Sequence, residues 1–235
     1  VTNGGISFPG QPDFYTAVNA PPGHYSMLCL LHPGMEIRID VKRSDQSVPP
    51  PSKVAAKAAA QVQQATTQDG PVADAQAQQV STSSIGNGHV QWAINAGGFS
   101  NNVTADEYLN SGVTIHVGDQ LQVVGTGEIH TATTPFHSVA HVPFVVTQCE
   151  VPGQDIPAQS PADCPDPSEF RIAFNSKALF PSRTHALTNP TRFVSSGLLP
   201  GPGASATFDA RTPGTYRFVC LVHGPSMSTT ITVVS

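Results

Sequence analysis

The stretch Tyr216-Arg-Phe-Val-Cys220-Leu-Val-His223-Gly-Pro-Ser-Met227, near the C-terminal end, decides how the rest of the sequence is interpreted. It places a thiol, an imidazole and a thioether at intervals of three and four residues. Because side chains alternate between the two faces of a β-strand, Tyr216, Phe218 and Cys220 share one face. The strand therefore directs the cysteine sulfur into an apolar interior, and the turn that follows brings the imidazole back to it.

A near copy of this pattern, Tyr25-Ser-Met-Leu-Cys29-Leu-Leu-His32-Pro-Gly-Met35, lies close to the other end of the chain. When the two cysteines are aligned, the tyrosine, the histidine and a preceding Pro-Gly pair match as well. The chain therefore contains one internal repeat, and Cys29, His32 and Met35 are a second set of candidate ligands.

The composition favours a β-protein with many turns. Charged residues make up only 11% of the 235 residues, which include 20 glycines and 22 prolines, and the alternating apolar stretches are short. This length is enough for one large core or two ordinary ones.

A formal net charge of −5 argues against a nucleic-acid partner. The sequence contains no run of about 18 apolar residues, so it predicts no membrane-spanning helix. The start Val1-Thr2-Asn3 has no signal-peptide pattern, which indicates a mature or truncated form.

Two further cysteines, Cys149 and Cys164, form a local pair in a proline-rich segment. A disulfide between them would close a loop of about 15 residues and contribute roughly 3 kcal/mol. Such a bond indicates an oxidising compartment, so we predict an extracytoplasmic protein that is periplasmic, cell-surface or secreted. Two free thiols in a loop are the alternative.

The chain divides into three parts by pattern. Residues 1–43 read as strand, turn and strand, too little for an independent sandwich, and are interpreted as the C-terminal part of a first domain. Residues 44–84 are an Ala/Gln-rich linker, in which Ser52 is expected to cap a helix and Asp69-Gly70-Pro71 to end it. A disordered low-complexity tether is the alternative for this linker.

Residues 85–235 are predicted to form a complete all-β domain. About seven or eight short strands suggest two packed sheets, interrupted by an insertion at about 135–169 that holds the Cys149 and Cys164 pair.

The ligand types point to copper. A thiolate with imidazole nitrogens binds copper tightly, and a weak axial thioether favours Cu(I). The second imidazole has to come from another strand, and His130 is the best candidate because it follows a Gly-Asp turn, an apolar strand and a Thr-Gly pair. His137 and His141 are the alternatives, whereas His116 is expected to face solvent.

Two simpler interpretations compete with copper. The first is a buried thiol, a surface imidazole and a core methionine that are adjacent by chance, which the second copy of the pattern argues against. The other is zinc, which one cysteine and a methionine in each motif suit poorly.

Taken together, Gly118-Asp119, Gly127-Glu-Ile-His130-Thr131 and Pro213 to Met227 resemble the cupredoxins, the plastocyanin and amicyanin class of small blue-copper proteins. Cys29-Leu-Leu-His32-Pro-Gly-Met35 is similar to the short amicyanin-type loop. The resemblance covers roughly residues 88–235 and, in part, 1–43.

This resemblance implies a Greek-key β-sandwich with one type-1 copper bound by His130, Cys220, His223 and Met227. It also implies that electrons leave through the exposed edge of His223. Cys29, His32 and Met35 would hold a second copper only if a further histidine were supplied to them.

The sequence departs from the larger copper proteins in two ways. It has no His-Cys-His or His-x-His motif, so the ligands of a trinuclear cluster or a catalytic second copper are missing. The first copy also lacks the strands that would precede it. Three explanations account for the missing strands: the chain is a fragment, another polypeptide supplies them, or the first site is a relic. We favour the fragment.

The leading hypothesis is an extracytoplasmic electron carrier that works with redox partner proteins. Copper storage or delivery is an alternative from the class of binding proteins. A structural assembly of cupredoxin modules, in which self-association or another chain completes the first domain, is the third. An enzyme, such as part of a copper oxidase or reductase, is the least supported.

Overall fold

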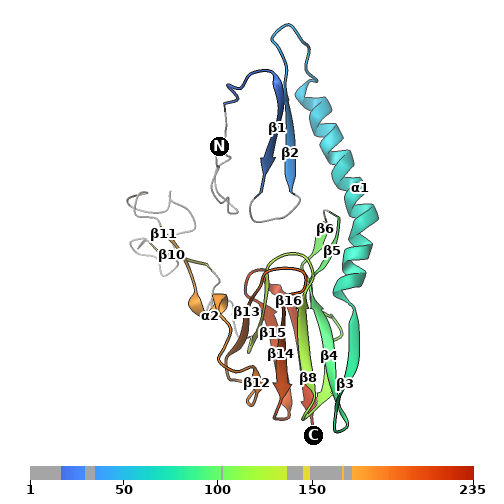
Figure 1. The fold of residues 1–235 in the computed structure, drawn as a ribbon, viewed down its shortest axis with the longest axis vertical. Coiled ribbons are helices and arrows are strands. Elements are labelled where there is room, and N and C mark those ends of the chain that lie inside the picture. The colour runs from blue at the N-terminus through green and yellow to red at the C-terminus, as the bar shows by residue number, and fades with distance from the viewer. Residues whose placement is uncertain (1–16, 30–34, 102, 137–144, 149–165, 167–170) are drawn as a thin grey trace. The chain divides into compact units, whose positions relative to one another are not determined.

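The computed structural model describes residues 17–29, 35–101, 103–136, 145–148, 166 and 171–235. The chain forms two compact units (Figure 1). The hairpin unit comprises residues 1–28, 36–48 and 145–175, and the site unit comprises residues 29–35, 49–144 and 176–235. None of the described helices is long and apolar enough to cross a membrane.

The hairpin unit contains two antiparallel strand pairs. β1 (Gly23–Leu28) pairs with β2 (Glu36–Val41), as the strand-turn-strand pattern predicted, and β10 (Val145–Gln148) pairs with β11 (Arg171–Phe174). Cys149 and Cys164 lie outside the described residues, so their disulfide stays a prediction.

In the site unit, the linker helix differs from its prediction at both ends. α1 (Pro51–Ala77) begins after Pro50, whose carbonyl accepts the first backbone hydrogen bonds, and Ser52 lies inside the helix rather than at its cap. The helix also continues through Pro71, which was predicted to end it. Proline removes one helical hydrogen bond and strains the preceding turn, so contacts with the rest of the unit must offset this cost.

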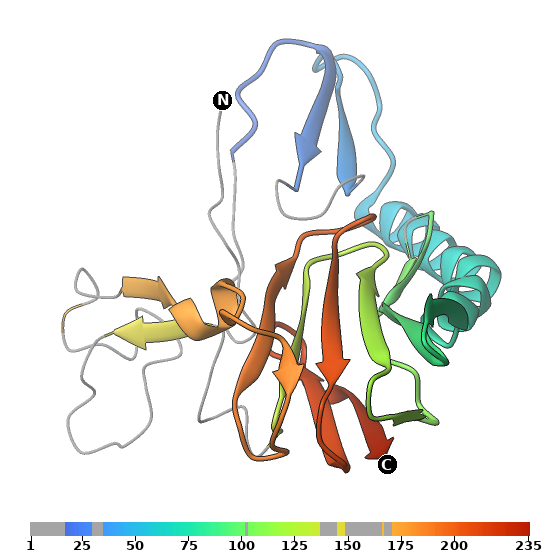
Figure 2. The same ribbon diagram turned by 60° about the horizontal axis from the view of Figure 1, so that its bottom comes forward.

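Those contacts join the C-terminal part of α1 to the hairpin of β5 (Gly98–Ser100) and β6 (Val103–Ala105), which lies along it in Figure 2. Ala73 and Ala77 are fully buried in a small apolar cluster with Ala105. A Cβ on Gly98 would lie 1.8 Å from the Ala73 carbonyl oxygen. The backbones of α1 and of the β5–β6 hairpin therefore approach as closely as glycine permits.

The rest of the site unit is a sandwich of two five-stranded sheets, which confirms the all-β sandwich predicted from the sequence. The first sheet contains, in spatial order, β12 (Ala186–Leu187), β14 (Ser205–Ala210), β8 (Gln120–Gly125), β4 (His89–Ala96) and β3 (Val80–Gly86). The second contains β13 (Val194–Leu199), β9 (His130–Thr134), β15 (Gly214–Cys220), β16 (Gly224–Val234) and β7 (Val113–His116).

The first sheet begins at Val80, before the boundary predicted at residue 85, so the end of the predicted linker is part of the sandwich. One short helix, α2 (Ser176–Leu179), packs beside β13. The division into a truncated first domain and a complete second domain stays a prediction.

Side chains that alternate along the strands build the core. Tyr216, Phe218 and Cys220 are all buried on one face of β15, as the period of two predicted. Phe218 meets Phe208 of the other sheet edge-on, with ring centroids 5.0 Å apart. The Tyr216 hydroxyl donates hydrogen bonds to the carbonyls of Leu187 and Thr212, both at 3.0 Å. The core thus fixes the direction of the strand that ends at Cys220.

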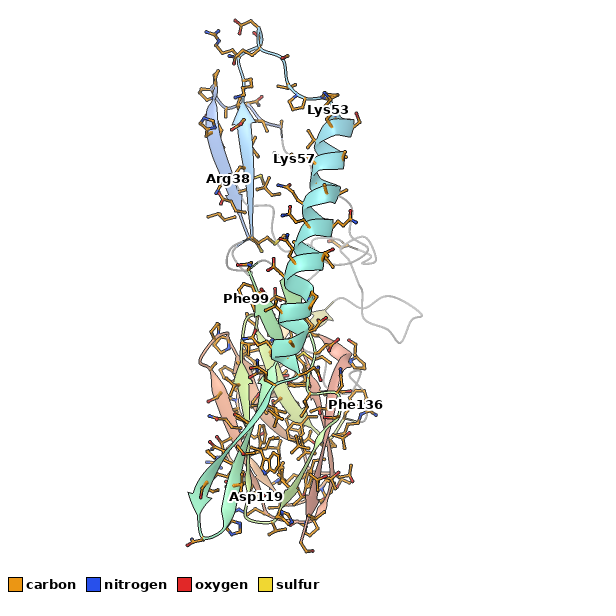
Figure 3. The ribbon with its side chains drawn as sticks, turned by 90° about the vertical axis from the view of Figure 1, so that its right-hand side faces the viewer. Arg38, Lys53, Lys57, Phe99, Asp119 and Phe136 are labelled. Carbon is orange, nitrogen blue, oxygen red and sulfur yellow. The ribbon has the colours of Figure 1, made fainter. Side chains whose placement is uncertain are left out.

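Asp119 lies at the end of the sandwich away from α1 and Phe99 (Figure 3). Its buried carboxylate accepts hydrogen bonds from the backbone N–H groups of Val90 and His116, both at 2.9 Å. Burial alone would raise the pKa of Asp119, but these hydrogen bonds lower it below its ordinary value. The carboxylate therefore stabilises the fold above its unfolded pKa, and this contribution is lost as the pH falls through the folded pKa.

We expect Asp119→Ala to lower the free energy of unfolding by about 2–4 kcal/mol, because two buried N–H groups lose a charged acceptor. Asp209→Ala, which removes a half-exposed carboxylate from the same sheet, should cost less than about 1 kcal/mol. Urea unfolding at neutral pH measures both values. Equal effects of the two substitutions would contradict the role given to Asp119.

Candidate metal centre

The strand pairing brings together segments that are far apart in the sequence. β9 begins at His130 and β15 ends at Cys220, and these two strands are antiparallel neighbours, with Thr133 opposite Val219. The turn between β15 and β16 then carries His223. Both imidazoles therefore reach the cysteine at one end of the second sheet.

The three donor atoms form a small triangle. The Cys220 sulfur lies 3.5 Å from Nδ1 of His223 and 3.9 Å from Nδ1 of His130, and the two Nδ1 atoms are 3.1 Å apart. A point equidistant from atoms with these separations lies about 2 Å from each, close to the bond lengths of about 2.0–2.3 Å that nitrogen and sulfur ligands make to zinc. The donor set therefore fits one transition-metal ion.

Burial separates three of the predicted ligands from water. Cys220 and Met227 have no exposed surface and belong to the same core cluster, and His130 is 2% exposed. The His223 side chain is 20% exposed. A metal held by Cys220, His130 and His223 would sit in a largely dry site from which one imidazole ring reaches the surface.

Thr131 holds the cysteine in place from the neighbouring strand. Its backbone N–H donates to the Cys220 sulfur at 3.4 Å, and its hydroxyl accepts the N–H of Leu221 at 2.7 Å. Its carbonyl accepts a hydrogen bond from the buried hydroxyl of Tyr108. These contacts restrain both the residue after His130 and the residue after Cys220, so the two ligands cannot move apart independently.

Gly97 packs directly against the His130 ring. Its φ is +78°, and a Cβ at this position would lie 2.6 Å from Nε2 of His130. The Gly97 N–H donates to the carbonyl of Glu107, and its carbonyl accepts the Thr126 hydroxyl at 2.7 Å. The Gly97 backbone is thus held against the His130 ring, whose Nδ1 lies on the side of the Cys220 thiol.

The helix α1 braces this same segment. The Gln76 side-chain oxygen accepts the N–H of Phe99 at 2.7 Å, and the Gln78 side-chain amide donates to the carbonyl of Tyr108 at 3.1 Å. Asp69 accepts hydrogen bonds from Ser100 and Asn101. The segment predicted as a linker therefore supports the backbone around the candidate centre.

The Cys220 thiol and the His223 imidazole shift each other's ionisation. Burial would raise the pKa of Cys220, but hydrogen bonds with His130 and His223 and the charge of His223 lower it to about 6. Burial would lower the pKa of His223, but its hydrogen bond to Cys220 and the negative charges around the ring raise it. The geometry thus favours a thiolate, the form that binds metals.

We expect the metal-free protein to show a thiolate absorbance step with a midpoint near pH 6 that Cys220→Ser lacks. Because the folded pKa lies below that of the unfolded thiol, this ionisation stabilises the fold fully above the unfolded pKa. The contribution is lost as the pH falls through about 6. An ultraviolet titration of both proteins measures the step, and a midpoint near the ordinary thiol value would contradict the geometry.

Of the other predicted site residues, His116 is exposed, as expected. It lies near Asp119, with 3.9 Å between its Nδ1 and a carboxylate oxygen. His137 and His141 lie outside the described residues, so they are untested as alternatives to His130.

The first motif is described only in part. The N–H of Cys29 donates to the carbonyl of Met35 at 3.0 Å, while His32 lies outside the described residues. Met35 is 58% exposed, whereas Met227 is fully buried. A metal site at Cys29, His32 and Met35 stays a prediction.

Sequence reasoning missed the residues around the ligands. Gly97-Gly98 is a weak signal of close backbone approach, which the structure shows at both positions. Glu128 and Thr131 lie in the quoted stretch around His130 but were given no role, and Asp106 was not considered, because only the fold brings these residues to Cys220 and His223.

Comparison with known proteins gives partial structural likenesses only. No family model and no curated protein matches the sequence. Auracyanin B is similar over 68% of this chain and 100% of its own, with 18% identity and a TM-score of 0.29. Dithionite-reduced auracyanin from the photosynthetic bacterium Roseiflexus castenholzii is similar over 52% of this chain and 82% of its own, with 20% identity and a TM-score of 0.22. The two-sheet sandwich itself, rather than these likenesses, confirms the all-β sandwich predicted from the sequence.

Proposed function

We propose that this chain is a type-1, or blue, copper protein that transfers single electrons outside the cytoplasm. His130, Cys220, His223 and Met227 would hold the metal. The observation that carries the proposal is the buried triangle of one sulfur and two Nδ1 atoms, all within 4.8 Å of one another. Thiolate, imidazole and a weak thioether are the donors that suit copper in electron transfer.

Bound copper would supply the one-electron couple between Cu(II) and Cu(I). The chain's own residues would keep the ligands still during the transfer. The Thr131 N–H donates to the Cys220 sulfur, and the backbone at Gly97 confines the His130 ring. Ligands held in this way need little rearrangement between oxidation states.

His223 is the proposed point of electron exchange, because it is the most exposed of the four proposed ligands. A redox partner protein would approach this ring. Storage or delivery of copper is less well supported, since ligands as buried as Cys220 and Met227 favour a retained ion over rapid exchange.

We propose a carrier rather than an enzyme. Among the described residues, two clusters of histidine, cysteine or carboxylate side chains have the spacing to hold a metal, and both include His223. The two clusters share the His223 ring, so the described residues offer no metal site separate from the proposed copper centre.

The proposal is tested by adding Cu(II) to the metal-free full chain. One equivalent is expected to produce an intense visible absorption from sulfur-to-copper charge transfer, which bleaches on reduction and returns on reoxidation. Bound copper without this absorption would contradict a type-1 centre.

A further inference from the structure

Two carboxylates face the outer edge of the His223 ring. Nδ1 of this ring lies 3.5 Å from the Cys220 sulfur, whereas Nε2 lies 3.8 Å from Oδ1 of Asp106 and 4.0 Å from Oε2 of Glu128. The ring therefore lies between the proposed metal position and a pair of negative charges. At these distances the carboxylates act on the ring mainly through their charge.

Both carboxylates belong to segments that are tied to the ligands. Asp106 precedes Glu107, whose carbonyl accepts the N–H of Gly97 at 2.9 Å. Glu128 lies in the connection that enters β9 at His130. The Glu128 side chain is 22% exposed and that of Asp106 is 41% exposed, so water screens Asp106 more. The pair is held near His223 by the same backbone that builds the candidate centre.

We propose that Asp106 and Glu128 are positioning residues for His223, an inference that rests on the copper site proposed above. Their charges favour the tautomer with the ring proton on Nε2, which frees Nδ1 to bind the metal. The same charges lower the reduction potential of the centre. Carboxylates beside the outer nitrogen of a ligating histidine commonly fix its tautomer and raise its basicity.

Competition for one proton explains why such a pair is needed. In the metal-free protein the Cys220 thiolate, 3.5 Å from Nδ1, attracts the ring proton to the nitrogen that must bind the metal. Asp106 and Glu128 attract it to Nε2 instead. Once copper is bound, the oxidised centre carries one more positive charge than the reduced centre, so nearby negative charges stabilise the oxidised state.

The test compares Asp106→Asn, Glu128→Gln and the double variant with Asp209→Asn. The last removes a carboxylate of similar exposure that belongs to β14. Nitrogen NMR of the metal-free proteins reports which ring nitrogen of His223 carries the proton. We expect a smaller share of Nε2–H in the double variant than in the wild type, and no change in Asp209→Asn. An unchanged tautomer in the double variant would overturn the positioning role, and this readout does not depend on copper.

Voltammetry of the copper-loaded proteins is the second readout. We expect the reduction potential to rise in each single variant and to rise further in the double variant, with no rise in Asp209→Asn. An unchanged potential would overturn the proposal. So would a second metal ion bound by the wild type and lost in Glu128→Gln, which would make the carboxylates ligands instead. If the blue-copper proposal itself were wrong, the wild-type protein would stay colourless with copper. That result is distinguishable from an unchanged tautomer or potential in the variants.

Discussion

Replacing Cys220 with serine is expected to abolish the intense visible absorption of the copper-loaded protein and to weaken copper binding by more than about 100-fold. The absorption requires a sulfur-to-copper bond, and a neutral hydroxyl is a far poorer ligand for copper than a thiolate. The substitution replaces a buried sulfur with a smaller oxygen and adds no volume to the core, so the metal-free variant should remain folded. Absorption spectra and a competition titration with a copper chelator measure the two effects, and thermal unfolding checks the fold.

Cys29→Ser is the matched control, because Cys29 occupies the corresponding position of the first motif. This variant should keep the absorption that arises from the Cys220 site. A loss of colour in Cys29→Ser together with retained colour in Cys220→Ser would transfer the copper centre to the first motif.

Gly97→Ala is expected to weaken copper binding by about 10–100-fold, because the new methyl group would push the His130 ring away from the triangle. A Cβ at residue 97 lies 2.6 Å from Nε2 of His130 and 3.2 Å from the carbonyl oxygen of Ala105, and the φ of +78° is unfavourable for alanine. We also expect the metal-free protein to lose about 1–3 kcal/mol of stability. Copper titration and urea unfolding measure these two quantities.

Gly86→Ala separates the two causes. Gly86 has a similar φ of +88°, but a Cβ there has no heavy atom within 4 Å. This variant should lose about 1–2 kcal/mol through its backbone alone and keep the copper affinity of the wild type. If Gly97→Ala behaved like Gly86→Ala in copper binding, contact with His130 would not matter for the site.

The spacing of Cys220, His223 and Met227 was enough to predict that a strand ends at the cysteine and that the next turn brings the histidine back to it. A strand followed by a tight turn leaves few possible positions for these side chains. The period of two in Tyr216, Phe218 and Cys220 predicted which side chains of β15 face the core, and the structure confirms that all three are buried. His130 was predicted because it follows a Gly-Asp turn, an apolar strand and a Thr-Gly pair, where a neighbouring strand would reach the same end of the sandwich. Its Nδ1 does lie 3.9 Å from the Cys220 sulfur.

Other elements depend on contacts that no local pattern reveals. The strand β13 contains Ser195 and Ser196, which are buried because their hydroxyls bond to Thr133 and to the N–H of Ala132. Because these buried positions are serines, the sequence of β13 lacks the alternation of apolar and polar residues by which a strand is predicted. Likewise α1 continues past Pro71 because its last turns pack on the β5–β6 hairpin, and local propensity carries no information about that surface.

The repeat in the sequence is not matched by equal burial in the structure. Tyr216 is fully buried, whereas Tyr25 at the corresponding position is 38% exposed. The strand β15 lies between β9 and β16, whereas β1 pairs with β2 in a two-stranded sheet. Among the residues that the structure describes, the second motif is therefore surrounded by a sandwich and the first is not, since burial depends on the neighbouring strands.

Anomalous diffraction at the copper absorption edge, from crystals of the copper-loaded full chain, tests the central claim most directly. We expect an anomalous peak between the Cys220 sulfur and the Nδ1 atoms of His130 and His223. Copper bound elsewhere in the chain, with no peak among these three atoms, would contradict it.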